Sequence, residues 1–237
     1  MYSMAAPHAK GKSAEDNIFA ANNRAIALAE KIGTENVVNA TVGSILDEDG
    51  SLVVLDVVKE ALSALTPKEM CAYAPIQGYR AFLDACIDQC FGKSRPEGYI
   101  DACSTPGGTG VLHHVVHNYS EVGDEVLISD WHWGAYDSLI DDNNRKVRTF
   151  SLLTEDGHFH AADFKEKVED ILSRQDNIVI ILNGIANNPT GYCLSDEEWQ
   201  AAIDVLKEAV KDETKKAILV PDVAYLDYSG KKEECRK

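Results

Sequence analysis

Five apolar segments in the second half of the chain alternate with stretches of helical periodicity, and this alternation restricts the fold more than any other feature. The segments are 99–104, 125–130, 146–152, 177–182 and 216–222. Segment 177–182, NIVIIL, is apolar on both faces, which is typical of a strand inside a parallel sheet. The helical stretches lie near 108–119, 134–142, 161–174 and 195–211. The alternation predicts βαβ crossovers and a mostly parallel sheet with helices on both faces.

The N-terminal third is organised differently. Ser13, with Asp16 three residues on, predicts the cap of a helix that runs to about Lys31, and Gly33 ends this helix. A short strand is expected at 36–40. Helical periodicity returns at 53–65 and 79–91.

The charge of the chain limits its partners. Lys and Arg number 23 against 39 Asp and Glu, which gives a formal charge of −16 and argues against nucleic acid and anionic membranes. No apolar run approaches the roughly 20 residues of a membrane span, and the first residues lack the apolar core of a signal peptide. The six cysteines form no CxxC motif. They predict reduced, partly buried thiols in a cytoplasmic protein.

A polar turn, NNPTG, follows the apolar segment 177–182. It brings the amide of Asn188 to the end of the strand, and Pro189 makes the turn rigid. Ser195, with Glu198 three residues on, then predicts a capping box that opens a helix. Open α/β sheets place ligand contacts at such strand–turn–helix junctions. Asn-Pro and Thr-Gly are also ordinary turn formers, so this motif alone leaves a purely structural turn open.

Two other predicted strands end in residues suited to ligand binding. After segment 99–104, Gly107, Gly108 and Thr109 stand at the start of a predicted helix, where free N–H groups and the helix dipole favour a phosphate. A flexible turn is the alternative there. After segment 125–130, Trp133 is expected to stack on a flat heterocycle, whereas Trp131 is expected to cover the sheet.

Asp222 ends the apolar strand 216–222, where an unpaired carboxylate is costly to bury. No Lys or Arg follows until the C-terminal residues, so a protonated ring nitrogen on a ligand would satisfy this acid. Tyr225 can donate to a second ligand atom. Taken singly, Asp222 could equally cap a helix or lie in solvent. Together, the four strand ends predict a site for a flat, phosphorylated, pyridine-bearing cofactor.

These residues belong to an ordered series that resembles the class I aminotransferases of the aspartate and aromatic type, which are fold-type I pyridoxal 5′-phosphate (PLP) enzymes. The series is VVNATVGSILDEDG, YAPIQGYRAF, GGTG, WGAY, NNPTG and DVAY. The resemblance implies an enzyme of the PLP-dependent transferase fold, with PLP as cofactor and an amino acid and a 2-oxo acid as substrates. It also implies that residues 1–48 form an N-terminal arm and the first part of a small domain. Residues 49–237 would then form an incomplete large PLP-binding domain.

The resemblance also implies roles for single residues. Asp222 would hold the pyridine nitrogen protonated, so that the ring can accept electrons from the substrate. Asn188 and Tyr225 would hydrogen-bond the phenolic oxygen of the ring, and Trp133 would stack on the ring. Asp222 and Tyr225 are therefore the predicted catalytic residues.

Further roles concern the phosphate, the substrate and a second subunit. Gly108 and Thr109 would bind the phosphate, and Gly43 would lie beside the substrate carboxylate, with Asn188 as a second substrate contact. Tyr73 would reach the phosphate of the neighbouring subunit's cofactor. This implies a homodimer with shared active sites, in which the N-terminal segment packs on the partner.

The sequence departs from the family pattern at two positions of the site. Gly107 replaces a serine of the phosphate loop, so one hydroxyl contact to the phosphate is expected to be missing. Tyr136 stands where the aspartate-specific enzymes have a histidine behind the pyridine-binding acid, which puts strict aspartate specificity in doubt.

The third departure concerns the Schiff-base lysine, which the family carries downstream of its Asp-x-x-Tyr motif. Lys231, Lys232 and Lys237 lie too close to Tyr225 and lack the expected context. We therefore expect the chain to be the amino-terminal portion of a longer enzyme, inactive alone.

Three alternatives remain open from the sequence. One is another PLP reaction on the same scaffold, such as a C–S lyase, and another is a non-catalytic cofactor-binding fragment. The third is metal binding through HHVVH, where His113 and His117 are four residues apart on one helix face. That motif has neither an HExxH glutamate nor an evident third ligand, so a structural role and no metal site are expected.

Overall fold

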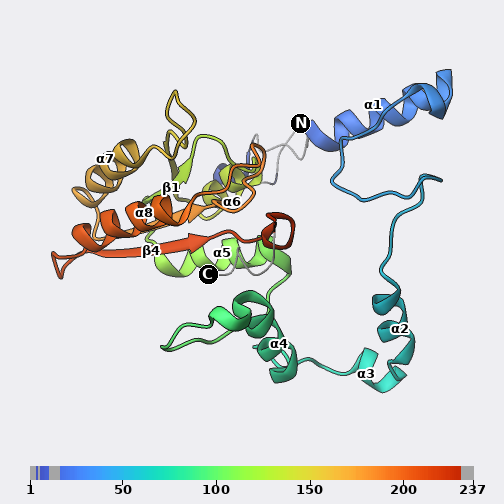
Figure 1. Ribbon diagram of the computed structural model, residues 1–237, viewed down its shortest axis with the longest axis horizontal. Coiled ribbons are helices and arrows are strands. Elements are labelled where there is room, and N and C mark those ends of the chain that lie inside the picture. The colour runs from blue at the N-terminus through green and yellow to red at the C-terminus, as the bar shows by residue number, and fades with distance from the viewer. Residues whose placement is uncertain (1–3, 5, 11–16, 231–237) are drawn as a thin grey trace. The chain divides into compact units, whose positions relative to one another are not determined.

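The computed structural model describes residues 4, 6–10 and 17–230 (Figure 1). Contacts between Cα atoms divide the chain into two units, Met1–Ala72 and Tyr73–Lys237. The predicted domain boundary after residue 48 stays a prediction.

The first unit consists of helices and extended connections. Its elements are η1 (Pro7–Ala9), α1 (Asn17–Ile32), η2 (Thr34–Asn36), α2 (Asp56–Ala64) and α3 (Pro67–Cys71). The predicted first helix forms and ends before Gly33, which has a φ of 97°; its predicted cap, Ser13, lies outside the described residues. The strand expected at 36–40 is wrong. Thr34–Asn36 forms a 3-10 turn instead, and no described segment pairs with residues 37–40 as a strand.

The second unit is built on a four-stranded parallel sheet. Its strands are β1 (Glu125–Ser129), β2 (Lys146–Phe150), β3 (Asn177–Leu182) and β4 (Lys216–Pro221), in the order β2-β1-β3-β4. Four of the five apolar segments therefore form strands, as predicted. Because all four strands are parallel, their carboxyl ends lie at one edge of the sheet.

Alternate side chains of the central strands enter two apolar clusters, one on each face of the sheet. Helices α5 (Gly107–Tyr119) and α6 (Ala135–Asp142) cover one face, and α7 (Ala161–Leu172) and α8 (Asp196–Ala209) cover the other (Figure 1). In β3, Val179 and Ile181 enter the cluster under α5 and α6, whereas Ile178, Ile180 and Leu182 enter the cluster under α7 and α8. This division explains why NIVIIL is apolar throughout, since burying each such side chain stabilises the fold by about 1.5–3 kcal/mol of free energy.

The strand predicted at 99–104 does not form. Tyr99 is 94% exposed, and the backbone N–H of Ser104 donates to the carbonyl of Gln77 at 2.9 Å rather than to a strand. A strand is stable only when a neighbour pairs with its N–H and C=O groups. No other described segment takes that position beside 99–104.

Two further sequence expectations concern α4 (Arg80–Phe91) and the cysteines. Helix α4 forms where predicted and buries Leu83 and Ile87. The expectation of partly buried thiols is wrong for Cys71, Cys86, Cys103 and Cys193, which are free and exposed, whereas Cys90 is half-buried. Cys86, for example, lies on the solvent-facing side of α4. Cys235 lies outside the described residues. None of the helices in the described ranges has the length and apolar character that a membrane-crossing helix needs.

Candidate active site

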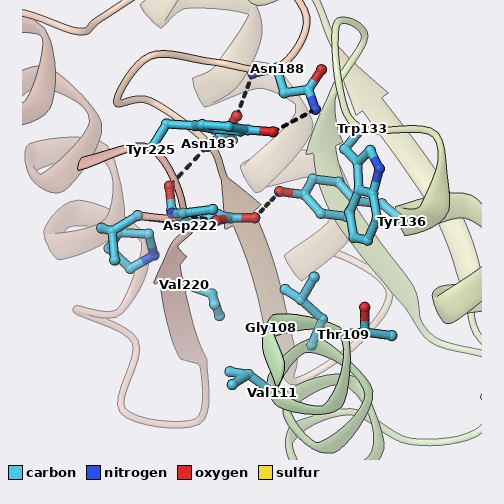
Figure 2. Close-up of a pocket in the computed structure, with 14 residues that line it drawn as sticks. Gly108, Thr109, Val111, Trp133, Tyr136, Asn183, Asn188, Val220, Asp222 and Tyr225 are labelled. Atoms are coloured by element: carbon cyan, nitrogen blue, oxygen red, sulfur yellow. Dashed lines mark hydrogen bonds between the residues drawn. The ribbon is translucent and has the colours of Figure 1, made fainter. Parts of the chain in front are cut away.

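A cavity of about 450 Å³ lies at the carboxyl ends of β1, β3 and β4 (Figure 2). Residues from several elements form its wall, because each parallel strand releases its following loop at this edge. Six residues predicted from the sequence line the cavity: Gly108, Thr109, Trp133, Asn188, Asp222 and Tyr225. The fold therefore brings the start of α5 together with residues that follow β1, β3 and β4.

One side of the cavity is the start of α5. Gly107 is the first residue of this helix and has a φ of 67°, a conformation in which a side chain is strained. A serine at position 107 would be strained in this conformation, which gives a physical reason why this chain has glycine in place of the family's serine. Gly108 follows, and a Cβ atom added to it would meet nothing within 4 Å. The N–H of Gly107 already donates to the carbonyl of Thr105 at 2.7 Å, but the space beside Gly108 is open, which suits anion binding at this helix start.

The acid of the site is Asp222, which follows β4 directly and is half-buried. Its backbone N–H donates to Leu182 O at 3.0 Å. Its Oδ1 accepts from the N–H of Ala224 at 3.0 Å, and its Oδ2 accepts from the hydroxyl of Tyr136. Among the described residues that line the cavity, none is a lysine, arginine or histidine. The carboxylate is therefore fixed in place without a cation from the cavity wall.

Tyr136, on α6, is almost fully buried, at 1% exposure. Its ring stacks on His132 at 6.1 Å and meets Trp133 edge-on at 5.8 Å. Burial, and then the hydrogen bond to Asp222, raise the pKa of the Tyr136 phenol well above its ordinary value. The phenol consequently stays a neutral donor to Asp222 at physiological pH.

A pair of polar side chains also faces the cavity: Asn188 comes from the turn after β3, and Tyr225 comes from the loop after β4. The side-chain amide of Asn188 donates to the hydroxyl of Tyr225 at 3.3 Å. Both residues line the cavity, and Figure 2 shows their polar ends directed toward one another. An amide and a hydroxyl placed together in this way can share one acceptor atom of a ligand.

Sequence reasoning missed Asn183, which also lines the cavity and is only 3% exposed. Its amide nitrogen donates to the carbonyl of Asp222 at 2.9 Å, and its amide oxygen accepts from the N–H of Asn188 at 2.6 Å. The available signal was a polar residue placed directly after an entirely apolar strand, where a buried amide needs partners.

Other predicted residues lie outside this cavity or are not placed in it. Tyr73 is fully exposed, and Gly43 belongs to the first unit; the roles predicted for both stay predictions. Lys231, Lys232 and Lys237 lie outside the described residues. Trp131 is 55% exposed and does not cover the sheet as expected; its backbone carbonyl accepts hydrogen bonds from the side chains of Ser129 and Asn187.

The histidine pair lies on the exposed side of α5, whereas Leu112 and Val116 form its buried side. The rings of His113 and His117 stack at 6.0 Å, and Asn143 donates to Nδ1 of His113 at 3.1 Å. Across the described ranges, no group of three or more His, Cys, Asp or Glu side chains is placed to hold a metal ion.

Comparison with known proteins identifies the family. The sequence profile named "Aminotransferase class I and II" matches residues 35–234. The chain belongs to this family. One relative is the chloroplastic aspartate aminotransferase of Arabidopsis thaliana. It is 30% identical over 199 residues, which cover 81% of this chain and 42% of that protein. The prediction from the ordered motifs is thus confirmed.

Solved aminotransferase structures share the fold. The aminotransferase from Anaerococcus prevotii is 37% identical, with a TM-score of 0.95 over all of this chain and 58% of its own. An aromatic-amino-acid aminotransferase from Burkholderia pseudomallei, described as covalently bound to pyridoxal phosphate, has a TM-score of 0.71 at 21% identity. This match covers 98% of this chain and 57% of that chain. The predicted fold class is confirmed, and the chain spans less than half of the Arabidopsis relative.

Proposed function

We propose that the protein containing this chain is a PLP-dependent aminotransferase that exchanges an amino group between an amino acid and a 2-oxo acid. The observation that carries the proposal is the arrangement of one cavity. The carboxylate of Asp222 lies beside the Asn188–Tyr225 pair, and the N-terminus of α5 forms another part of the same wall.

The residues of the cavity fit PLP in size and in chemistry. A volume of about 450 Å³ lies within the usual range for small-ligand sites, about 300–1,000 Å³. The carboxylate of Asp222 has no cation beside it in the cavity wall and suits a protonated pyridine nitrogen. The open space at Gly108, where an added Cβ atom would meet nothing within 4 Å, suits a phosphate at this helix start.

Bound PLP would supply the electron sink that labilises bonds at the substrate Cα. Asp222 would keep the proton on the pyridine nitrogen, and the phenol of Tyr136 would hold Oδ2 of this acid in position. Asn188 and Tyr225 would bind the phenolic oxygen of the ring. Trp133 would limit the tilt of the ring, and Gly108 and Thr109 would bind the phosphate.

Relatives support this assignment. The Arabidopsis relative is named an aspartate aminotransferase, and the Burkholderia neighbour, an aromatic-amino-acid enzyme, binds pyridoxal phosphate covalently. We extend the proposal to a substrate of the aspartate or aromatic type. Because Tyr136 replaces the histidine of the aspartate-specific enzymes, we do not assign strict aspartate specificity.

The proposal includes a cytoplasmic homodimer in which Tyr73 reaches the cofactor phosphate of the partner subunit and Gly43 lies near the substrate carboxylate. Tyr73 is fully exposed, as a residue that acts on a neighbour would be. The first unit also exposes large apolar side chains, including Phe19, Val38 and Leu62 at 58%, 96% and 60%. Exposed apolar side chains in such number are typical of surfaces that a partner covers.

The proposal is tested by assaying the full-length protein with PLP, aspartate or phenylalanine, and 2-oxoglutarate. We expect glutamate to form only when both an amino acid and the 2-oxo acid are present. Consumption of the amino acid with no 2-oxo acid added would instead indicate a lyase-type PLP reaction. Absence of turnover with either class of amino acid, in a protein that binds PLP, would contradict the proposed reaction.

A further inference from the structure

Asn183 connects two loops that form the cavity wall. It follows β3 directly and is buried. Its Nδ2 donates to the carbonyl oxygen of Asp222 at 2.9 Å, and its Oδ1 accepts from the backbone N–H of Asn188 at 2.6 Å (Figure 2). A carbonyl can only accept and a peptide N–H can only donate, so these partners fix the orientation of the amide.

Both partners are backbone groups of residues whose side chains line the cavity. Asp222 carries the acid, and Asn188 carries the amide that bonds Tyr225. One buried side chain thus ties the loop after β4 to the turn after β3. A polar group that is buried and bonded at both ends is held rigidly, since breaking either bond leaves a buried backbone group unsatisfied.

We propose that Asn183 is a positioning residue that sets the separation between the Asp222 carboxylate and the Asn188–Tyr225 pair. The inference rests on the proposed function, because this separation matters when one flat ring must meet the acid at its nitrogen and the pair at its phenolic oxygen. Asn183 acts through the two backbones that it holds. A displacement of either loop would leave the ring bonded at one end only.

Substitutions at Asn183 separate this role from a general contribution to stability. Asn183→Asp keeps an acceptor for the N–H of Asn188 but places a carboxylate oxygen against the carbonyl of Asp222, which pushes the two loops apart. Asn183→Ser keeps a polar group that is too short to span both partners. Asn143 is a matched control: it is also buried, at 4% exposure, its amide donates to Leu139 O at 2.8 Å, and it does not line the cavity.

The experiment uses the full-length protein as wild type, N183D, N183S, N143D and N143S. PLP affinity is measured by titration, the orientation of the bound ring by its induced circular dichroism, and stability by urea unfolding. We expect both Asn183 variants to bind PLP roughly tenfold more weakly or worse, equivalent to about 1.4 kcal/mol, with a changed dichroism band. The Asn143 variants should lose stability and keep both PLP readouts.

The outcomes separate the two levels of the argument. If the wild type binds PLP and the Asn183 variants match it in affinity and dichroism, the positioning role is wrong while the proposed function stands. Equal losses of affinity in the Asn143 and Asn183 variants would also overturn the positioning role, because general destabilisation would then explain both. A wild type that binds no PLP overturns the proposed function, and this inference with it.

Discussion

The hydroxyl of Tyr136 donates a hydrogen bond to Oδ2 of Asp222, although the two residues are 86 positions apart in the sequence. Helix α6 supplies the donor and the end of β4 supplies the acceptor. The bond therefore depends on the packing of α6 against the sheet, and it couples the fold to the chemistry of the cavity.

Tyr136→Phe removes the hydroxyl that holds Asp222 while keeping the stacked ring. We expect a loss of about 1–2 kcal/mol in the free energy of unfolding and PLP binding weakened roughly fivefold or more. The control is Tyr192→Phe, since the Tyr192 hydroxyl also bonds a carboxylate, Glu198, at 2.6 Å but lies outside the cavity. It should lose stability only. Equal PLP affinities in the two variants would refute the role of Tyr136.

Trp133 lines the cavity, whereas Trp131 is largely exposed. PLP added to the full-length protein should therefore quench mainly the emission of Trp133. Trp133→Phe should lose most of this quenching and weaken PLP binding a few-fold, because an aromatic contact of this kind contributes about 0.5–1.5 kcal/mol. Trp131→Phe should keep the quenching. The prediction fails if the emission lost on PLP addition disappears with Trp131 instead.

Gly107 and Gly108 should respond differently to an added methyl group. Gly107→Ala places a Cβ at a φ of 67° and should cost about 1–2 kcal/mol of stability. Gly108→Ala meets nothing within 4 Å, so its unfolding should match the wild type. Its methyl group would nevertheless lie beside the helix N–H groups and weaken binding of inorganic phosphate. Urea unfolding and phosphate titration of both variants test this contrast.

Glu198 contributes stability that depends on pH. Burial acts against its charge, but hydrogen bonds from Tyr192 and from the backbone N–H groups of Phe159 and Ser195 outweigh burial and hold its pKa below the usual value. This stabilisation is present above the pKa of an unfolded glutamate, about 4.3, and is lost as the pH falls through the lower folded-state pKa.

Glu198→Gln should therefore lower the free energy of unfolding by about 1 kcal/mol at pH 7, as expected for a disrupted cap. The difference from the wild type should shrink below about pH 4. Glu197→Gln is the matched control, because Glu197 is exposed in the same helical turn. A difference that stays constant from pH 7 to pH 3 would show that the charge of Glu198 does not cause the effect.

The sequence predicted the elements whose stability is local or patterned. NIVIIL had to lie between two covered faces, and Ser195 with Glu198 had to open a helix; both form as predicted. Segment 99–104 has strand character of its own, but pairing depends on a neighbour that local pattern cannot supply. The role of Asn183 was likewise hidden, since one of its two backbone partners lies 39 positions away. Trp133, Asn188 and Asp222 could be recognised because each follows a strand that was itself predictable, whereas Gly108 and Thr109 were recognised from the glycine-rich helix start alone.

The most direct test of the account is a PLP titration of the full-length wild type, Asp222→Asn and Asp137→Asn. Asp137 lies near the site, against His132 at 3.2 Å, but does not line the cavity. We predict saturable binding to the wild type and to Asp137→Asn. Binding to Asp222→Asn should be weaker by about a hundredfold or more, because the charged partner of the pyridine nitrogen is lost. Equal affinity in Asp222→Asn and the wild type, or no saturable binding by the wild type, would contradict the assignment of this cavity to PLP.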